Sequence, residues 1–171
     1  MNKNATCYTL HTTRVLGIDP GYERLGIAII EKLSGGKESY VYSECFKTSS
    51  KEEHHLRLSK IQKIVESYIK KYNPNALAIE SLFLNTNQKT AIKVAEARGV
   101  VLATCSSFGM DVYEYTPLQI KTAVTGYGRS EKSQVMSMVG KLIKLPEGKK
   151  WQDDEYDAIA VALTCFACIR F

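Results

Sequence analysis

The stretch Arg14-Val-Leu-Gly-Ile-Asp19, closed by Pro20-Gly21, decides the fold of this chain. Its almost continuous apolar run is typical of a β-strand buried on both faces, and the Pro-Gly pair ends such a strand in a turn. Similar runs predict two further strands, at residues 25–31 and 40–46. Because the links between the three are short, we expect an antiparallel meander.

The period of the apolar residues changes after His54, where they fall on one face of a helix that ends at Asn73-Pro74. Residues 76–80, Ala-Leu-Ala-Ile-Glu, then indicate a buried strand. Since a helix joins this strand to the meander, right-handed crossover geometry predicts parallel pairing with an earlier strand, most economically the first.

The remaining pattern predicts a helix at 88–107, a strand at 112–115, a short helix after Thr116-Pro117, a helix at 131–143 and a last helix from Asp153. The expected class is α/β, with a five-stranded mixed sheet of three antiparallel and then two parallel strands, flanked by helices. A chain of 171 residues has the length of one domain. We expect a flexible N-terminal lead-in at 1–13 and a single domain at 14–171.

Composition excludes several classes of protein. With 44% hydrophobic and 24% charged residues the chain can bury a core, and its longest apolar run is too short to span a bilayer. We therefore expect a cytoplasmic protein with no membrane segment. The net charge of +5 suits a polyanionic partner without identifying one. The five cysteines are odd in number and mostly lie in apolar runs, which favours reduced thiols over disulfides or a zinc site.

Four acidic residues stand at positions where they would meet. Asp19 and Glu80 end two strands expected to be parallel neighbours, at the edge where open α/β sheets bind ligands. Asp154 and Asp157 are one turn apart on one face of the last helix. Taken singly, Asp19 could open a turn, Glu80 could cap a loop, and the two aspartates could favour a helix N-terminus.

Together the four are harder to explain as local structure. Carboxylates ~4 Å apart repel by roughly 4 kcal/mol per pair at an effective dielectric constant near 20, so a fold avoids them unless cations bind there. Hard oxygen ligands select Mg²⁺ or Mn²⁺, and a pair of such ions supports phosphodiester hydrolysis. The sequence thus predicts a metal-dependent phosphodiesterase.

The chain also resembles a known family, the RuvC Holliday junction resolvases of the ribonuclease H-like superfamily, from Val15 to about Phe166. The resemblance is carried by LGIDPG at 16–21, AIES with Phe83 at 78–83, EARG at 96–99, GYGRSEKSQV at 126–135 and DDEYDAIAVA at 153–162. It implies a ribonuclease H-like fold. It also implies that Asp19, Glu80, Asp154 and Asp157 are the catalytic and metal-binding acids, with two Mg²⁺ ions per active site and Mn²⁺ as a substitute.

The resemblance further implies DNA contacts. Phe83 would stack on bases near the junction centre, and Lys121 and Lys132 would contact phosphates. The alternatives are a core phenylalanine and solvated lysines. Gly126 and Gly128 would let the backbone approach a phosphate or would simply form a flexible turn. Further candidates for phosphate contacts come from charge alone: Lys89, Arg98, Arg129 and the pair Lys149-Lys150.

The partners implied by the resemblance are four-way junction DNA, a second copy of the chain and the RuvA–RuvB branch-migration complex. A homodimer would nick two strands symmetrically, leaving 5′-phosphate and 3′-hydroxyl ends, in DNA recombination and repair. The surface between the two copies would be the second helix, where Ala91, Ala95 and Ala97 permit close packing. These alanines could equally face the sheet. Residues 1–13 precede the usual family start, and Trp151 has no recognised role.

Two other functions remain open at this point. Asp19-x-Gly21-x4-Gly26 also fits the phosphate loop of actin-like ATPases, but those need a second domain for which the chain has no room, and no GxxxxGK[ST] motif occurs. A non-catalytic junction-binding module would predict an incomplete acid set, whereas all four acids are present.

Overall fold

A five-stranded sheet with the strand order β3-β2-β1-β4-β5 organises the chain. The computed structural model describes residues 12–33, 35–82 and 88–169, without the side chains of 88–90. In chain order the elements are β1 (Thr12–Asp19), β2 (Arg24–Leu33), β3 (Glu38–Lys47), α1 (His54–Tyr72), β4 (Ala76–Glu80), α2 (Gln88–Ser107), β5 (Asp111–Tyr115), α3 (Pro117–Thr125), α4 (Lys132–Leu142) and α5 (Asp153–Cys168).

The pairing confirms the expected mixed sheet. β1 to β3 form an antiparallel meander, while β4 pairs in parallel with β1, and β5 in parallel with β4. β1 begins at Thr12 rather than Arg14, because its pairing with β2 continues to the Thr12–Leu33 pair. The rest of the expected lead-in, residues 1–11, lies outside the described residues.

The two faces of the sheet carry side chains of different size. On one face the central strands present large aliphatic residues, among them Leu16, Ile27 and Leu77, which pack with α1 and α2. On the other face a row of small residues crosses three strands, because Gly17 pairs with Ala28 on one side and Ala78 on the other. This alternation follows from the two-residue period of a strand.

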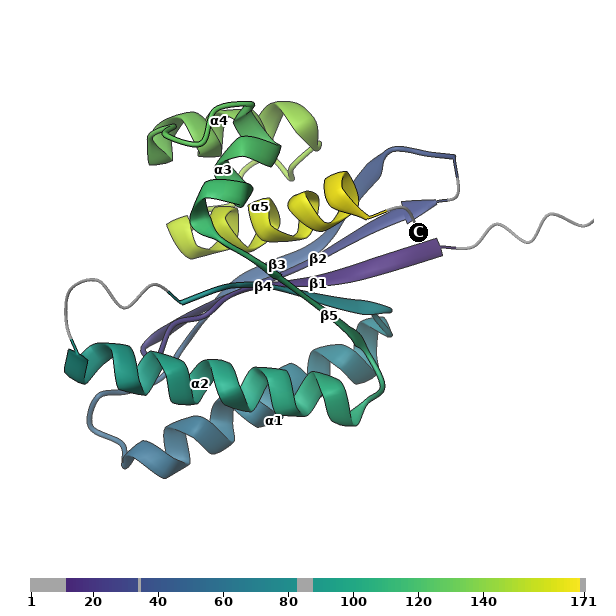
Figure 1. The fold of residues 1–171 in the computed structure, drawn as a ribbon. Coiled ribbons are helices and arrows are strands. Elements are labelled where there is room, and N and C mark those ends of the chain that lie inside the picture. The colour runs from purple at the N-terminus through teal and green to yellow at the C-terminus, as the bar shows by residue number, and fades with distance from the viewer. Residues whose placement is uncertain (1–11, 34, 83–87, 170–171) are drawn as a thin grey trace, which may run out of the picture.

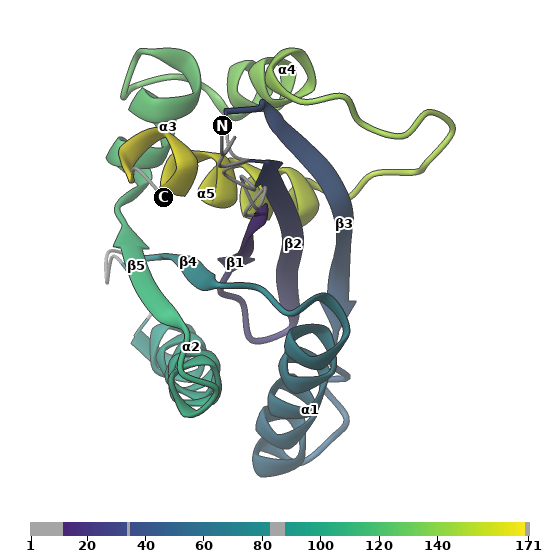
Figure 2. The ribbon, with the colours of Figure 1, turned by 90° about the vertical axis from the view of Figure 1, so that its right-hand side faces the viewer.

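α5 packs against this row of small residues. A Cβ atom added to Gly17 would overlap the carbonyl oxygen of Ala158 and the side chain of Ala162, so the helix touches the backbone of β1. α1 and α2 cover the opposite face, and α3 and α4 lie over α5 (Figures 1 and 2). α5 is therefore enclosed between the sheet and two helices, and every residue from Ala158 to Phe166 is buried.

This burial explains the longest apolar run of the sequence: it is a central helix, apolar on all sides. In the part of the chain that the structure describes, no helix has both the length and the apolar character needed to cross a membrane.

Candidate active site

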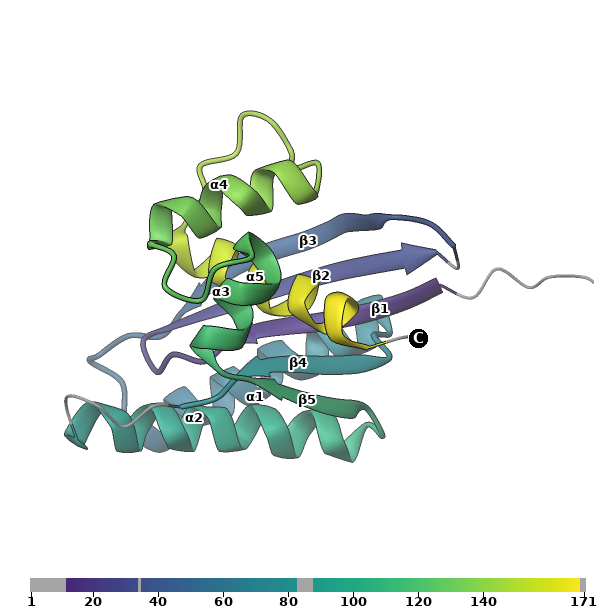
Figure 3. The same cartoon turned by 45° about the horizontal axis from the view of Figure 1, so that its top comes forward.

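The four acidic residues identified in the sequence meet at one end of the sheet. Asp19 and Glu80 are the last residues of the parallel neighbours β1 and β4, directly after the paired residues Ile18 and Ile79. α5 begins at this same end, as Figure 3 shows, and brings Asp154 and Asp157 there in its first turns. Residues distant in the sequence thus form one acidic cluster.

Asp19 lies in the centre of this cluster. Burial, together with the charges of Asp157, Glu80 and Asp154, raises the pKa of Asp19 to about 7, against the weaker opposing effect of Lys132. The pKa of Glu80 is also raised, by burial and then by Asp157, while Lys121 and Lys132 act in the opposite direction. The negative charges of these carboxyl groups thus oppose one another's ionisation.

The two aspartates of α5 are held by cationic side chains. Arg24, at the start of β2, donates from Nε to both Asp154 oxygens, at 3.0 and 3.2 Å, and its Nη2 bonds Oδ2 as well. Burial raises the pKa of Asp154, but the hydrogen bond and charge of Arg24, together with a backbone hydrogen bond and Cys45, outweigh burial and lower this pKa. Lys132 of α4 donates to Asp157 Oδ2 at 2.8 Å.

These ion pairs bear on metal binding. Among the described side chains, no three acidic, histidine or cysteine residues are close enough together to hold a metal ion as they stand. Two of the four carboxylates, those of Asp154 and Asp157, are already paired with Arg24 and Lys132. The donor set nevertheless fits Mg²⁺ or Mn²⁺, since it consists of carboxylate oxygens whose mutual repulsion a divalent cation would remove.

A cavity of about 260 Å³ adjoins the acidic cluster. Its lining includes the acidic residues Glu80 and Asp157 and the basic residues Lys121 and Lys132, of which Lys132 pairs with Asp157. Its apolar lining comes from α3, α4 and α5: Pro117, Ile120, Val135, Ala160 and Val161. Lys121 and Lys132 thus lie in the same cavity as Glu80 and Asp157, and their contacts with phosphate remain a prediction.

The other predicted DNA contacts either do not line this cavity or fall on residues or side chains that the structure does not describe. Gly126 ends α3 with a φ of 77°, and Gly128 packs its backbone against Leu118 in the turn that leads to α4. Arg129, in the same turn, is exposed. Phe83 lies outside the described residues, and Lys89 is in α2 but its side chain is not described.

Arg98, which its charge suggested as a phosphate contact, binds other residues of the fold. Its Nε donates to the backbone oxygen of Glu80 at 3.2 Å, and its guanidinium pairs with Glu114 of β5. The side chain is 15% exposed. Arg98 therefore ties α2 to the end of β4 and fixes the backbone from which the Glu80 carboxylate extends.

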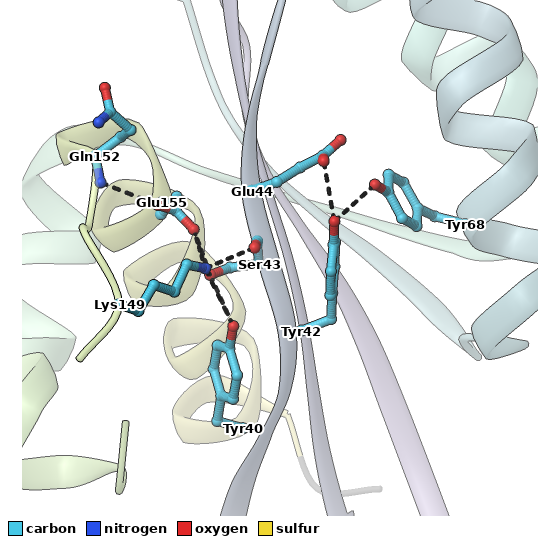
Figure 4. A network of polar contacts seen from close by, with 8 residues as sticks. All are labelled: Tyr40, Tyr42, Ser43, Glu44, Tyr68, Lys149, Gln152 and Glu155. Atoms are coloured by element: carbon cyan, nitrogen blue, oxygen red, sulfur yellow. Dashed lines mark hydrogen bonds and ion pairs between the residues drawn. The ribbon is translucent and has the colours of Figure 1, made fainter. Parts of the chain in front are cut away.

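A second polar network fixes the start of α5 against β3 (Figure 4). The Glu155 carboxylate is buried and accepts hydrogen bonds from Ser43 Oγ at 2.9 Å, from the Gln152 backbone at 2.9 Å and from Lys149. Lys149 also donates to the Ser43 carbonyl oxygen at 2.8 Å and lies 4.3 Å from the centre of the Trp151 ring. Lys149, another suggested phosphate contact, thus takes part in positioning α5, and Trp151 packs beside it.

Sequence reasoning missed three of these positioning residues. Arg24 could have been found, because it precedes Gly26 by two residues and so faces α5 from the same side of β2. Lys149 and Glu155 carried no such signal, since their partner Ser43 lies more than a hundred residues away.

Comparison with known proteins agrees with this geometry. The family model described as "Crossover junction endodeoxyribonuclease RuvC" matches residues 15–165. The curated RuvC of Caldicellulosiruptor saccharolyticus is 45% identical over 150 residues, which cover 88% of this chain and 90% of that protein. The RuvC of Halothermothrix orenii is 47% identical over 149 residues, covering 87% and 89% respectively.

A solved structure matches as well. The Thermus thermophilus RuvC in complex with a Holliday junction substrate is similar with a TM-score of 0.84 and 33% identity, covering 91% of this chain and 94% of that one. This similarity confirms the expected ribonuclease H-like fold. The chain therefore belongs to the RuvC family of crossover junction endodeoxyribonucleases.

Proposed function

We propose that this chain resolves four-way DNA junctions by metal-dependent hydrolysis of phosphodiester bonds in recombination and repair. The observation that carries the proposal is the Asp19 carboxyl, buried at a strand end among three other carboxyls, with its pKa raised to about 7. Such a cluster costs folding free energy unless cations bind to it. Family membership, and the junction bound to the Thermus thermophilus relative, support the choice of substrate.

In this proposal Asp19, Glu80, Asp154 and Asp157 hold two Mg²⁺ ions, which Mn²⁺ can replace. Bound ions of this kind activate a water molecule and stabilise the leaving oxygen of a phosphodiester. Asp19 must lose its proton to become a ligand, so ion uptake releases a proton near neutral pH. Lys121 and Lys132, which line the adjoining cavity, attract the phosphates on either side of the cut.

Symmetric cleavage requires two such sites, and we propose a homodimer that matches the two-fold symmetry of the junction. α2 offers a surface for it. Ala97 is buried against α1 and the sheet, but Ala95 and Gly99 are exposed beside Ile92, whose side chain is 61% exposed. Each protomer would leave a 5′-phosphate and a 3′-hydroxyl. Coupling to the RuvA–RuvB branch-migration complex remains a prediction.

The decisive experiment compares four-way, forked and linear duplex DNA, each with Mg²⁺ and with Mn²⁺. We expect cleavage of the four-way junction alone, and a fall of more than about a hundredfold in the Asp157→Asn variant with junction binding retained. Asp111→Asn is the matched control, because Asp111 is an exposed aspartate at the opposite end of the parallel strands. Equal cutting of all three DNAs would identify a general nuclease, and undiminished cleavage by Asp157→Asn would refute the site.

A further inference from the structure

Arg24 is a cation that the chain itself supplies to the acidic cluster. It opens β2, two residues before Gly26, and the two-residue period of the strand turns both toward α5. At Gly26 the strand touches the backbone of Asp154, so closely that an added Cβ atom would overlap the Asp154 carbonyl oxygen. This close approach places the Arg24 guanidinium directly on the Asp154 carboxylate.

The contact uses both carboxylate oxygens. Nε of Arg24 donates to Oδ1 and Oδ2, and Nη2 adds a bond to Oδ2 while lying 3.4 Å from Gln152 Oε1. The nearby Cys45 thiol lowers the pKa of the same carboxylate further. A two-oxygen contact of this kind is stronger than the single bond that Lys132 makes to Asp157.

A metal ion at Asp154 would need the same oxygen atoms. A carboxylate has about four lone-pair positions on its two oxygens, and Arg24 already binds both oxygens. The guanidinium would in addition repel a divalent ion at this short distance. The metal ion and Arg24 therefore compete for the Asp154 carboxylate. The Arg24 side chain is 46% exposed, so it can move into solvent when the ion displaces it.

We infer that Arg24 is a built-in counter-ion of Asp154, which a divalent metal ion must displace before the site is complete. The inference rests on the proposed metal site. In the protein without DNA, Arg24 neutralises Asp154 and lowers the metal affinity of the acidic cluster. It is a positioning residue that acts through Asp154.

The direction in which the loss of Arg24 changes the metal affinity distinguishes competition with the metal from simple structural support of Asp154. If Arg24 only held Asp154 in place for the metal, its removal would weaken metal binding. If it competes with the metal, Arg24→Gln should tighten Mn²⁺ binding by about tenfold, which corresponds to about 1.4 kcal/mol. Titration calorimetry of the free protein with Mn²⁺ alone, without DNA, measures this directly, and the Mn²⁺-induced rise in Tm provides a second readout.

Three variants complete the test. Arg24→Lys keeps the charge but loses the two-oxygen contact, so its Mn²⁺ affinity should lie between wild type and Arg24→Gln. Arg14→Gln is the matched control, because Arg14 makes a similar pair with Glu31 on β1 and β2, away from the acids, and should leave Mn²⁺ affinity unchanged. In an Asp154→Asn background, Arg24→Gln should no longer tighten binding.

The outcomes distinguish the inference from the proposed function. If wild type and Arg24→Gln both fail to bind Mn²⁺, the metal site and the inference fall together. If wild type binds Mn²⁺, Asp157→Asn loses that binding, and Arg24→Gln binds no more tightly than wild type, the site stands and the role of Arg24 is refuted. Tightening that persists in the Asp154→Asn background also refutes it.

Discussion

At the scale of single residues, the Asp19 carboxyl has the clearest energetic consequence. Its pKa is about 7 in the folded protein and about 3.9 in an unfolded chain. Between these values the folded state binds a proton that the unfolded state has lost, so the contribution of Asp19 to stability falls as pH rises from about 4 to 7. Above pH 7 the buried, ionised carboxylate opposes folding.

Asp19→Asn should therefore stabilise the metal-free protein, and more at pH 8 than at pH 5. The upper limit at pH 8 is about 4 kcal/mol, from a shift of about three pKa units. Urea unfolding in the presence of EDTA at the two pH values gives the measurement, with Asp111→Asn as an exposed control. A variant that is no more stable than wild type at pH 8 would contradict the raised pKa.

At the scale of elements, the contact of α5 with the sheet determines where Asp154 and Asp157 lie. Gly17 is the residue on which this contact depends, because any side chain there would meet Ala158 and Ala162. Gly17→Ala should push α5 outward and destabilise the fold by about 1–3 kcal/mol. Cleavage should fall further than the folded fraction does, since the two aspartates move away from Asp19 and Glu80.

Urea unfolding and single-turnover cleavage at a temperature where the variant is folded test this expectation. Gly140→Ala provides the comparison, because Gly140 lies in α4 with open space around it. There the same substitution should be neutral or stabilise by up to about 1 kcal/mol. Full cleavage by folded Gly17→Ala would show that the site tolerates a displaced α5.

The Lys149–Glu155 pair is a second element-scale feature, because it joins the start of α5 to β3. Lys149→Met would remove the lysine that pairs with the buried Glu155 carboxylate, and we expect a loss of about 3–5 kcal/mol in the free energy of unfolding. The double variant Lys149→Met/Glu155→Gln should recover part of it. Lys150→Met, at the exposed neighbouring position, should change stability by less than about 0.5 kcal/mol in the same urea titrations. An equal loss from Lys150→Met would contradict the specific role of Lys149.

Much of the fold and the acidic cluster followed from the sequence because their signals are local. Periodicity marked the strands and helices, and acids at the ends of two parallel strands had to emerge together. The ion pairs could not be predicted in this way. The two-residue period of β2 gives the side on which Arg24 lies, but its pairing with Asp154 depends on how closely α5 approaches the sheet, which the small residues Gly17 and Gly26 decide. The Arg98–Glu114 pair depends on how α2 packs on the opposite face.

At the scale of the whole molecule, the exposed side of α2 should decide the oligomeric state. Ile92→Glu would place a charge in the proposed dimer surface, so we expect a monomer in analytical ultracentrifugation and loss of paired nicking. Leu142→Glu, on an exposed leucine of α4, should leave the dimer intact. A dimer that survives Ile92→Glu would place the contact between protomers elsewhere.

The position of α5 at the end of the element order also has a consequence for how the protein is made. Synthesis proceeds from the N-terminus, so all five strands leave the ribosome before the helix that carries Asp154 and Asp157. A nascent chain holds only half of the proposed catalytic acids, and its row of small residues has no helix to cover it. The acidic cluster can therefore be completed only after α5 has been synthesised.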